Sequence, residues 1–274
     1  MLTLNSQGKT LSSSKPLIMG ILNVTPDSFY QKSRVTAVSE AIDLTGHMLA
    51  DGASIIDIGG QSTRPGAQAI AANEEMDRIG GVIEALVKTF PAAFISVDTY
   101  HSEVAKQVVG LGAHIINDIS GGQYDANMFK TIAALNVPYV VMHVNENRDQ
   151  MHTVNNEASI LPVVHDFFTA TSNAAKEVGI HQLILDPGFG FSKTPAQNFE
   201  LISNLSAFAC FQKPLLIGVS RKSTIYKTLG ITAADALNGS TVLHTAAILN
   251  GASILRVHEV KEANEVVTLC SYLE

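Results

Sequence analysis

The sequence predicts an α/β fold, a single-domain (β/α)8 TIM barrel. Three observations lead to this prediction: apolar runs typical of buried parallel strands recur along the chain, segments with helical spacing separate them, and about eight strand-then-helix units result. Strands that alternate with helices pair in parallel through right-handed crossovers, and eight such units close a barrel. An open doubly wound sheet is the rival fold.

Eight apolar runs are the candidate strands, and nearly every one leads into a polar residue. In a closed ring of parallel strands the chemistry takes place where the strands end, so these polar residues are the first candidates for a site. The runs are 17–22 before Asn23, 54–58 before a glycine loop with Thr63 and Arg64, 94–97 before Asp98, 114–116 before Asn117 and Asp118, 139–142 before His143, 182–185 before Asp186, 215–219 before Ser220, and 253–255 before Arg256.

The segments between these runs have apolar residues at helical spacing, and most end at a residue that stops helices. Asn73 is the expected N-cap of the second helix, and Pro91 follows the end of that helix. The predicted helices are 35–50, 74–90, 102–109, 126–135, 157–178, 195–209, 233–249 and 259–273.

The first sixteen residues precede this repeat, so residues 1–16 are predicted to be an N-terminal extension and 17–274 the barrel domain. Within the extension, residues 2–11 are expected to form a small hairpin or a lid. No change in composition marks a second domain.

Composition excludes several classes of function. The 274 residues are 46% hydrophobic and 16% charged, which is enough apolar surface for a full core. The net charge of -7 and the lack of basic runs argue against nucleic-acid and membrane partners. Only Cys210 and Cys270 are present, so neither a disulfide framework nor a zinc site is expected, and a reducing cytoplasm fits best. No apolar run is long enough to predict a signal peptide or a membrane span.

Three loops after predicted strands have a composition suited to binding. The loop 23–29 ends in Phe29 and is either an ordinary turn or a mobile lid. The loop 59–66 is either a surface glycine loop or a phosphate site, because glycine admits close approach and Arg64 offers a planar fork. The loop 186–194 combines glycine and phenylalanine, which suits a flat substrate, and its spacing is not that of a nucleotide phosphate loop.

The polar strand ends divide into two chemical sets. Asp98, Asn117 and Asp186 could pair with the edge of a nitrogen heterocycle that has an amino-pyrimidinone pattern, since buried carboxylates need donors. A single aspartate would more often be a helix cap. The cations of 220–223, with Arg256 and His258, predict an anion site for a phosphoryl or pyrophosphoryl group. Asn23 could help to hold Mg²⁺, which commonly enters with phosphates.

These segments together resemble the dihydropteroate synthase family, enzymes of the folate pathway that sulfonamides target. The resemblance covers essentially the whole chain, and its specificity lies in the order and spacing of the motifs. The motifs are 19–29 (Met-Gly-Ile-Leu-Asn-Val-Thr-Pro-Asp-Ser-Phe), 59–65 with Ser-Thr-Arg-Pro, 97–99 (Val-Asp-Thr), 116–118 (Ile-Asn-Asp), 186–191 (Asp-Pro-Gly-Phe-Gly-Phe), 220–223 (Ser-Arg-Lys-Ser) and 256–258 (Arg-Val-His).

The resemblance implies condensation of 6-hydroxymethyl-7,8-dihydropterin diphosphate with 4-aminobenzoate, with Mg²⁺ as cofactor, in a homodimer that sulfonamides inhibit. It also implies the site residues, with Lys222, Arg256, His258, Arg64 and Asp98 as the catalytic group. The pterin would be held by Asp98, Asn117, Asp186, Lys222 and Met142, the diphosphate by Asn23, Arg64, Arg256 and His258, the metal by Asn23, and 4-aminobenzoate by Thr63, Pro65, Phe191, Ser223 and Phe29.

The chain departs from the family pattern in the predicted lid. After Phe29 the family typically reads Ser-Asp-Gly-Gly, whereas residues 30–33 are Tyr-Gln-Lys-Ser, so an acid and two glycines are lost. Gln61 for Glu, Ser192 for Gly and Glu259 for Asp are milder changes. Two other functions remain as alternatives: a non-catalytic pterin-binding paralogue, and a pterin-dependent methyltransferase domain with a corrinoid partner. The second has no need for the anion-binding motifs.

Overall fold

Eight parallel strands form a closed barrel in this computed structural model, which describes residues 1–24, 34–62, 66–145, 147–154 and 158–273. The strand order is β8-β7-β6-β5-β4-β3-β10-β9, and a parallel bridge between Leu185 and Leu215 joins the two ends of that order. The (β/α)8 barrel prediction is therefore confirmed, and the rival open sheet is wrong.

Each predicted apolar run supplies one barrel strand. The strand from the run 215–219 is much shorter than the run, because only two of its residues lie in the ladder to β10. The strands are β3 (Leu17–Asn23), β4 (Ile55–Gly59), β5 (Phe94–Asp98), β6 (Ile115–Asp118), β7 (Tyr139–Met142), β8 (Leu183–Asp186), β9 (Leu216–Ile217) and β10 (Ile254–Val257).

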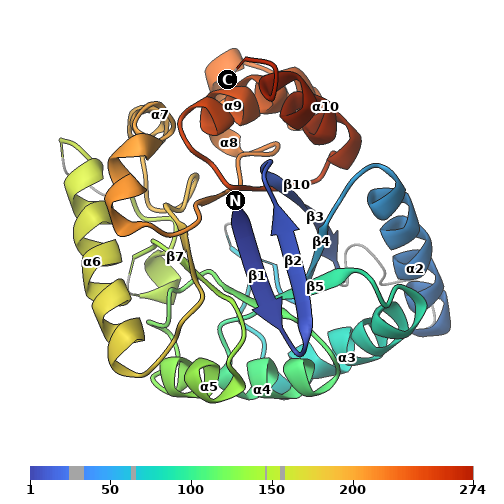
Figure 1. Ribbon diagram of the computed structural model, residues 1–274. Helices are drawn as coiled ribbons and strands as arrows, with labels where there is room; N and C mark the ends of the chain where they lie inside the picture. Colours follow the sequence, from blue (N-terminus) through green and yellow to red (C-terminus); the bar gives the residue numbers. More distant parts are fainter. Residues whose placement is uncertain (25–33, 63–65, 146, 155–157, 274) are drawn as a thin grey trace.

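Helices surround the strands on the outside of the barrel (Figure 1). Hydrophobic side chains that point outward from the strands pack against these helices in one large apolar cluster. The helices are α2 (Arg34–Ala50), α3 (Ala72–Thr89), α4 (Ser102–Gly110), α5 (Met128–Leu135), α6 (Leu161–Glu177), α7 (Pro195–Ser203), α8 (Ser223–Leu229), α9 (Leu237–Leu249) and α10 (Val260–Cys270), with 3-10 turns η1 (Arg148–Gln150) and η2 (Leu205–Phe211).

Several helix ends differ from the predictions. Asn73 is not the N-cap of α3, because that helix begins at Ala72, two residues before the predicted start, and Ala71 occupies the cap position. The predicted helix 195–209 is wrong as a single element: α7 ends at Ser203, and η2 follows. The helix α8 was not predicted, because its seven residues are too few to show a helical period.

The N-terminal extension is a hairpin, and the lid alternative is wrong. Strands β1 (Leu2–Ser6) and β2 (Lys9–Ser13) pair antiparallel. The buried side chain of Leu4 joins an apolar cluster made by residues at or next to the start of the barrel strands, among them Leu17, Ile55 and Phe94. Figure 1 shows the hairpin lying across the barrel. The hairpin therefore closes the end opposite to the polar strand ends.

The barrel interior changes from apolar to polar along β4. In β4, Ile55 packs in the cluster beneath the hairpin, whereas Ile56 and Ile58 face the helices. Because side chains alternate along a strand, Asp57 points into the barrel above Ile55. This polar layer forms the floor of the candidate site.

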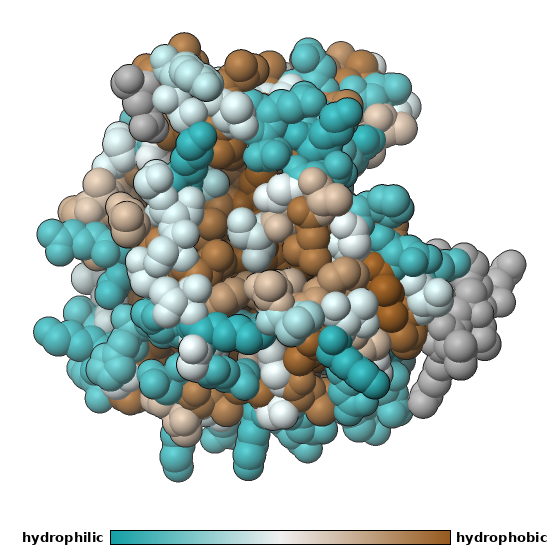
Figure 2. Space-filling model, turned by 45° about the vertical axis from the view of Figure 1, so that its right-hand side comes forward, coloured by the Kyte–Doolittle hydropathy of each residue, from teal (hydrophilic) through white to brown (hydrophobic). Residues whose placement is uncertain are grey.

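On the face of the molecule that Figure 2 shows, hydrophilic side chains lie at the rim, and hydrophobic ones lie mainly in the recesses. Among the described residues, none of the helices combines the length and the hydropathy that crossing a membrane requires.

Candidate active site

Arg256 of β10 connects two aspartates of neighbouring strands at the centre of the polar layer. Its Nε donates to Oδ2 of Asp57 at 2.6 Å, and its Nη2 donates to Oδ2 of Asp98 at 2.8 Å. Asn117 of β6 donates from Nδ2 to the same Asp57 oxygen at 3.0 Å. The structure thus brings Asp98 and Asn117, predicted for the edge of a heterocycle, together with Arg256, predicted for a separate anion site.

Asp57 is the residue of this cluster that sequence reasoning missed. It is fully buried and lies inside a strand rather than at its end. The available signal was its charge in the middle of the apolar run 54–58, because a charge in such a position must have a partner.

The charges of this cluster are set by burial and mutual attraction. Burial raises the pKa of Asp98 to about 7, and the nearby Arg256 cation opposes that rise. Burial would lower the pKa of Arg256, but Asp57 and Asp98 outweigh it and raise that pKa. Arg256 therefore remains a cation at any pH at which the protein is folded.

Asp118, the neighbour of Asn117, has a structural role instead. Its Oδ1 accepts from the backbone and the hydroxyl of Ser120, and its Oδ2 accepts from Gly122 N at 2.9 Å and from the Tyr139 hydroxyl at 2.6 Å. With both oxygens used in this way, Asp118 anchors the β6–α5 loop and is not a ligand for a substrate.

Lys222 lies beside the aromatic loop that follows β8. It is the N-cap of α8, and its Nζ lies 4.6 Å from the centroid of the Phe191 ring and donates to the Phe189 carbonyl. Burial lowers the pKa of Lys222 to about 8, while Asp186 opposes that change. Burial raises the pKa of Asp186, and Lys222 is the strongest opposing influence. The charge of each group therefore favours the ionised form of the other.

The loop 186–194 is held by a buried lysine that the sequence did not single out. Lys193 Nζ donates to the carbonyls of Gly188 and Phe191 at 3.0 Å and lies 2.9 Å from Nδ1 of His143. Burial, helped by the nearby Lys193 cation, lowers the pKa of His143 to about 2. His143 is therefore a neutral acceptor here, and Lys193 fixes the loop that carries Phe191.

The motif 220–223 divides its two cations between different tasks. Arg221 forms an ion pair with Glu259 and donates from Nη1 to the carbonyls of Ala233 and Ala234 at 2.9 and 2.6 Å. It therefore stabilises the loop before α9. Lys222 is the cation of this motif that faces the aromatic loop.

His258 shares a small network with Ser220. The Ser220 hydroxyl donates to Glu259 Oε2 at 2.9 Å, which leaves its oxygen to accept from His258 Nδ1 at 3.1 Å. This contact holds the ring, and the residue keeps part of its surface open to solvent. Burial is the largest cause that lowers the pKa of His258.

The other predicted site residues that the structure describes lie at the same end of the barrel. Met142 is buried in one apolar cluster with Phe191. Asn23 is exposed at the end of β3, next to Gly59 of β4, and Ser223 begins α8. Phe29, Thr63, Arg64 and Pro65 lie outside the described residues, and so does the altered lid segment 30–33.

Gln61 belongs to a chain of hydrogen bonds that explains its difference from the family's glutamate. Its Nε2 donates to buried Glu75 at 3.2 Å, and its Oε1 accepts from the Tyr100 hydroxyl at 2.7 Å. Burial raises the pKa of Glu75. An amide can donate and accept at once, whereas an ionised glutamate at position 61 would place a second carboxylate beside Glu75.

Comparison with known proteins agrees with this geometry. Residues 19–258 match the family model described as pterin binding enzyme. The dihydropteroate synthase of Streptococcus pyogenes serotype M6 is 39% identical over 97% of this chain and 98% of its own length. The chain belongs to the dihydropteroate synthase family.

Other dihydropteroate synthases show the same similarity in sequence and in structure. The Escherichia coli K12 enzyme is 38% identical over 96% of this chain and 93% of its own length. The crystal structure of a Yersinia pestis dihydropteroate synthase in complex with a sulfonamide drug superposes with a TM-score of 0.92 at 37% identity, covering 99% of each chain.

Proposed function

We propose that this chain catalyses the dihydropteroate synthase reaction. In that reaction 6-hydroxymethyl-7,8-dihydropterin diphosphate and 4-aminobenzoate give 7,8-dihydropteroate and pyrophosphate. The observation that supports it most is the cluster of Asp98, Asn117 and Arg256 at the carboxyl ends of the strands. It occurs in a chain with 39% identity to a dihydropteroate synthase over nearly its whole length.

The pterin ring would bind in the polar layer between Asp186, Asn117 and Asp98. Asp186 is buried, and its Oδ1 accepts from Gly188 N at 2.7 Å, which leaves Oδ2 for the paired donors of an aminopyrimidinone edge. Lys222 and Met142 would pack against the ring. A buried carboxylate without such donors is costly, so ligand binding would satisfy this group.

The diphosphate would bind near Arg256, His258, Arg64 and Asn23. The C–O bond to the diphosphate breaks with its electron pair on the leaving oxygen, a C–N bond forms to the arylamine, and the amine loses one proton. Arg256 and Lys222 would stabilise the departing negative charge, and His258 would do so in its protonated form, because Nδ1 already donates to Ser220 and Nε2 carries a proton only in the cation. No protein nucleophile is needed.

A magnesium ion fits the donors present. Among the described residues, no group of three or more His, Cys, Asp or Glu side chains is arranged to hold a metal ion. Mg²⁺ is commonly held by one or two protein oxygens together with waters and substrate phosphates. Asn23, exposed at the end of β3, could supply such an oxygen. The ion would neutralise charge on the leaving diphosphate.

The arylamine would bind outside the pterin, against Phe191 and Ser223. Phe29, Thr63 and Pro65 would complete this pocket, in which sulfonamides would compete with 4-aminobenzoate. Closure of the surrounding loops would exclude water from the reacting methylene carbon.

The test is release of pyrophosphate by the full chain with both substrates and Mg²⁺. We expect release only when 4-aminobenzoate is present, and inhibition by a sulfonamide that higher 4-aminobenzoate concentrations relieve. Tight binding of the pterin diphosphate without any pyrophosphate release would contradict this proposal and favour the non-catalytic paralogue. A chain in which residues 30–33 are changed to Ser-Asp-Gly-Gly would show whether the altered lid alone limits turnover.

We also infer that residues 1–16 and 17–274 act as one folding unit.

We infer further that two chains associate through α9 and α10. Val242 and Leu249 are 58% and 56% exposed on one face of α9, and Leu269 is 67% exposed on α10. Light scattering should give the mass of a dimer, and Val242→Glu should give a monomer. A monomeric wild-type chain would contradict the inference.

A further inference from the structure

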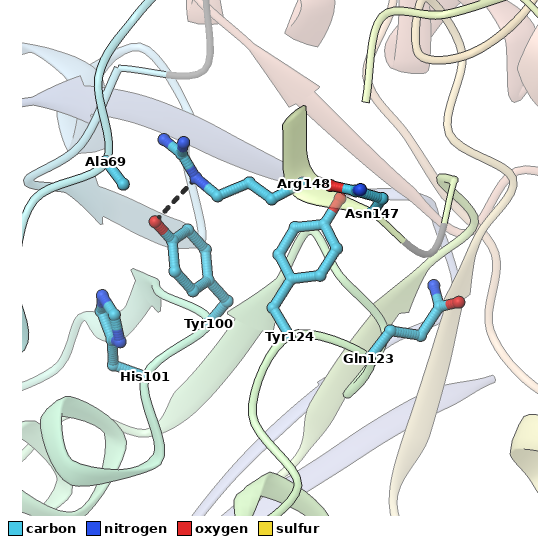
Figure 3. Close-up of a pocket in the computed structure, with 7 residues that line it drawn as sticks. All are labelled: Ala69, Tyr100, His101, Gln123, Tyr124, Asn147 and Arg148. Atoms are coloured by element: carbon cyan, nitrogen blue, oxygen red, sulfur yellow. Dashed lines mark hydrogen bonds between the residues drawn. The ribbon is translucent and has the colours of Figure 1, made fainter. Parts of the chain in front are cut away.

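A pocket beside the proposed pterin site has no task in the reaction described above. It lies where the loops after β4, β5, β6 and β7 meet, and its volume is about 600 Å³ (Figure 3). Tyr100 also belongs to the apolar cluster of Met142 and Phe191, so the pocket adjoins the proposed substrate site. The pocket is lined by Ala69, Tyr100, His101, Gln123, Tyr124, Asn147 and Arg148.

Arg148 makes this pocket attractive to an anion. Its Nε donates to the Tyr100 hydroxyl at 3.0 Å, which holds the guanidinium near the Tyr100 ring, 5.8 Å from its centroid (Figure 3). Within the described part of the chain, neither Nη1 nor Nη2 makes a hydrogen bond, and none of the lining residues is acidic. Two parallel N–H groups of an arginine match the two oxygens of a carboxylate.

Two tyrosines give the pocket an aromatic wall. The rings of Tyr100 and Tyr124 meet edge to face, with centroids 5.6 Å apart. Their hydroxyls are already occupied, because Tyr100 donates to Gln61 and Tyr124 donates to the Asn145 carbonyl at 3.1 Å. Both rings are therefore held in place, and because Tyr100 is only 6% exposed, the half-buried Tyr124 offers most of the aromatic surface to a flat ligand.

We propose that this pocket binds an aromatic carboxylate, with its carboxylate at Arg148 and its ring against Tyr100 and Tyr124. The natural ligand would be 4-aminobenzoate, an assignment that rests on the proposed function. The pocket would then be an outer position for the arylamine substrate, separate from the reacting position at Phe191 and Ser223.

The test uses benzoate, which lacks the amine and cannot react. Its dissociation constant is measured by calorimetry on the full chain without pterin diphosphate. Arg148→Gln should weaken binding by about tenfold or more, the usual effect of losing a hydrogen bond to a charged group. Arg148→Lys, which keeps the charge, should weaken it less. The matched control is Lys176→Gln, which removes an exposed cation from α6 and should leave binding unchanged.

Two further probes separate charge from aromaticity. Benzamide has the ring without the charge, and cyclohexanecarboxylate has the charge without an aromatic ring; both should bind more weakly than benzoate. Equal binding of benzoate by wild type and Arg148→Gln would overturn the proposal, and so would equal binding of benzoate and cyclohexanecarboxylate. A thermal unfolding curve for each variant verifies that the fold is intact.

The result is independent of whether the chain is a synthase. If benzoate binding depends on Arg148 but the wild type releases no pyrophosphate, the pocket stands and the proposed function fails. If pyrophosphate is released but benzoate binding does not depend on Arg148, the proposed function stands and the pocket proposal fails.

Discussion

Arg256 is positioned by two acids, and Asp57 is the one that is fully buried. We expect Asp57→Asn to cost about 2–3 kcal/mol of unfolding free energy, because it leaves the partly buried Arg256 cation with one carboxylate fewer. Urea unfolding measures this. The control is Glu74→Gln, which removes the half-exposed partner of Arg78 and should cost less than about 1 kcal/mol. Similar costs for both variants would contradict the assigned role of Asp57.

Lys222 gives the proposed reaction a pH dependence with a definite sign. Burial lowers the pKa of its ammonium group to about 8, so the cation is present below that pH and lost above it. We therefore expect kcat/KM, which reports the free enzyme, to fall as pH rises through about 8. Lys222→Arg should shift that fall to higher pH. The same alkaline fall in the arginine variant would show that another group titrates.

The loop after β8 contains a position that only glycine can occupy. Gly188 has φ +71°, and a Cβ there would lie 2.0 Å from the His143 carbonyl oxygen. Gly188→Ala should therefore displace the loop 186–194 and abolish pterin binding, measured by calorimetry with the pterin diphosphate.

A matched variant separates the effect of space from that of conformation. Gly179, after α6, has φ +85°, but a Cβ there would meet nothing within 4 Å. Gly179→Ala should cost only about 1 kcal/mol for its backbone conformation and leave pterin binding unchanged. Equal loss of binding in both variants would contradict a specific role of the contact at Gly188.

Element boundaries were less predictable than element types. The strands were visible because buried parallel strands are continuously apolar. Asn73 looked like a cap because cap preferences are local, but α3 begins two residues before its predicted start, with an extended Ala71 before it. The break between α7 and η2 was invisible, since both segments have apolar residues that pack against the barrel.

The hairpin and the site lie at opposite ends of the whole molecule, so stability and activity should separate. Leu4 is 2% exposed in the cluster that closes the barrel. Leu4→Ala should lower the unfolding free energy by about 2–4 kcal/mol through the cavity it leaves. Pyrophosphate release well below the melting temperature should be unchanged. A large loss of activity in the folded variant would show that the hairpin influences the site.

The eight strand-then-helix units and the polar residues at the strand ends could be predicted from the chain, because they depend on local periodicity and on a shared position along each strand. How those residues pair became known with the fold. Arg256 meets Asp57 across 199 positions and Asp98 across 158 positions. The fold also assigned Arg221 and Asp118 to structural roles and Lys193 to the aromatic loop. Such contacts depend on barrel closure, which places distant segments a few ångströms apart and leaves no local pattern.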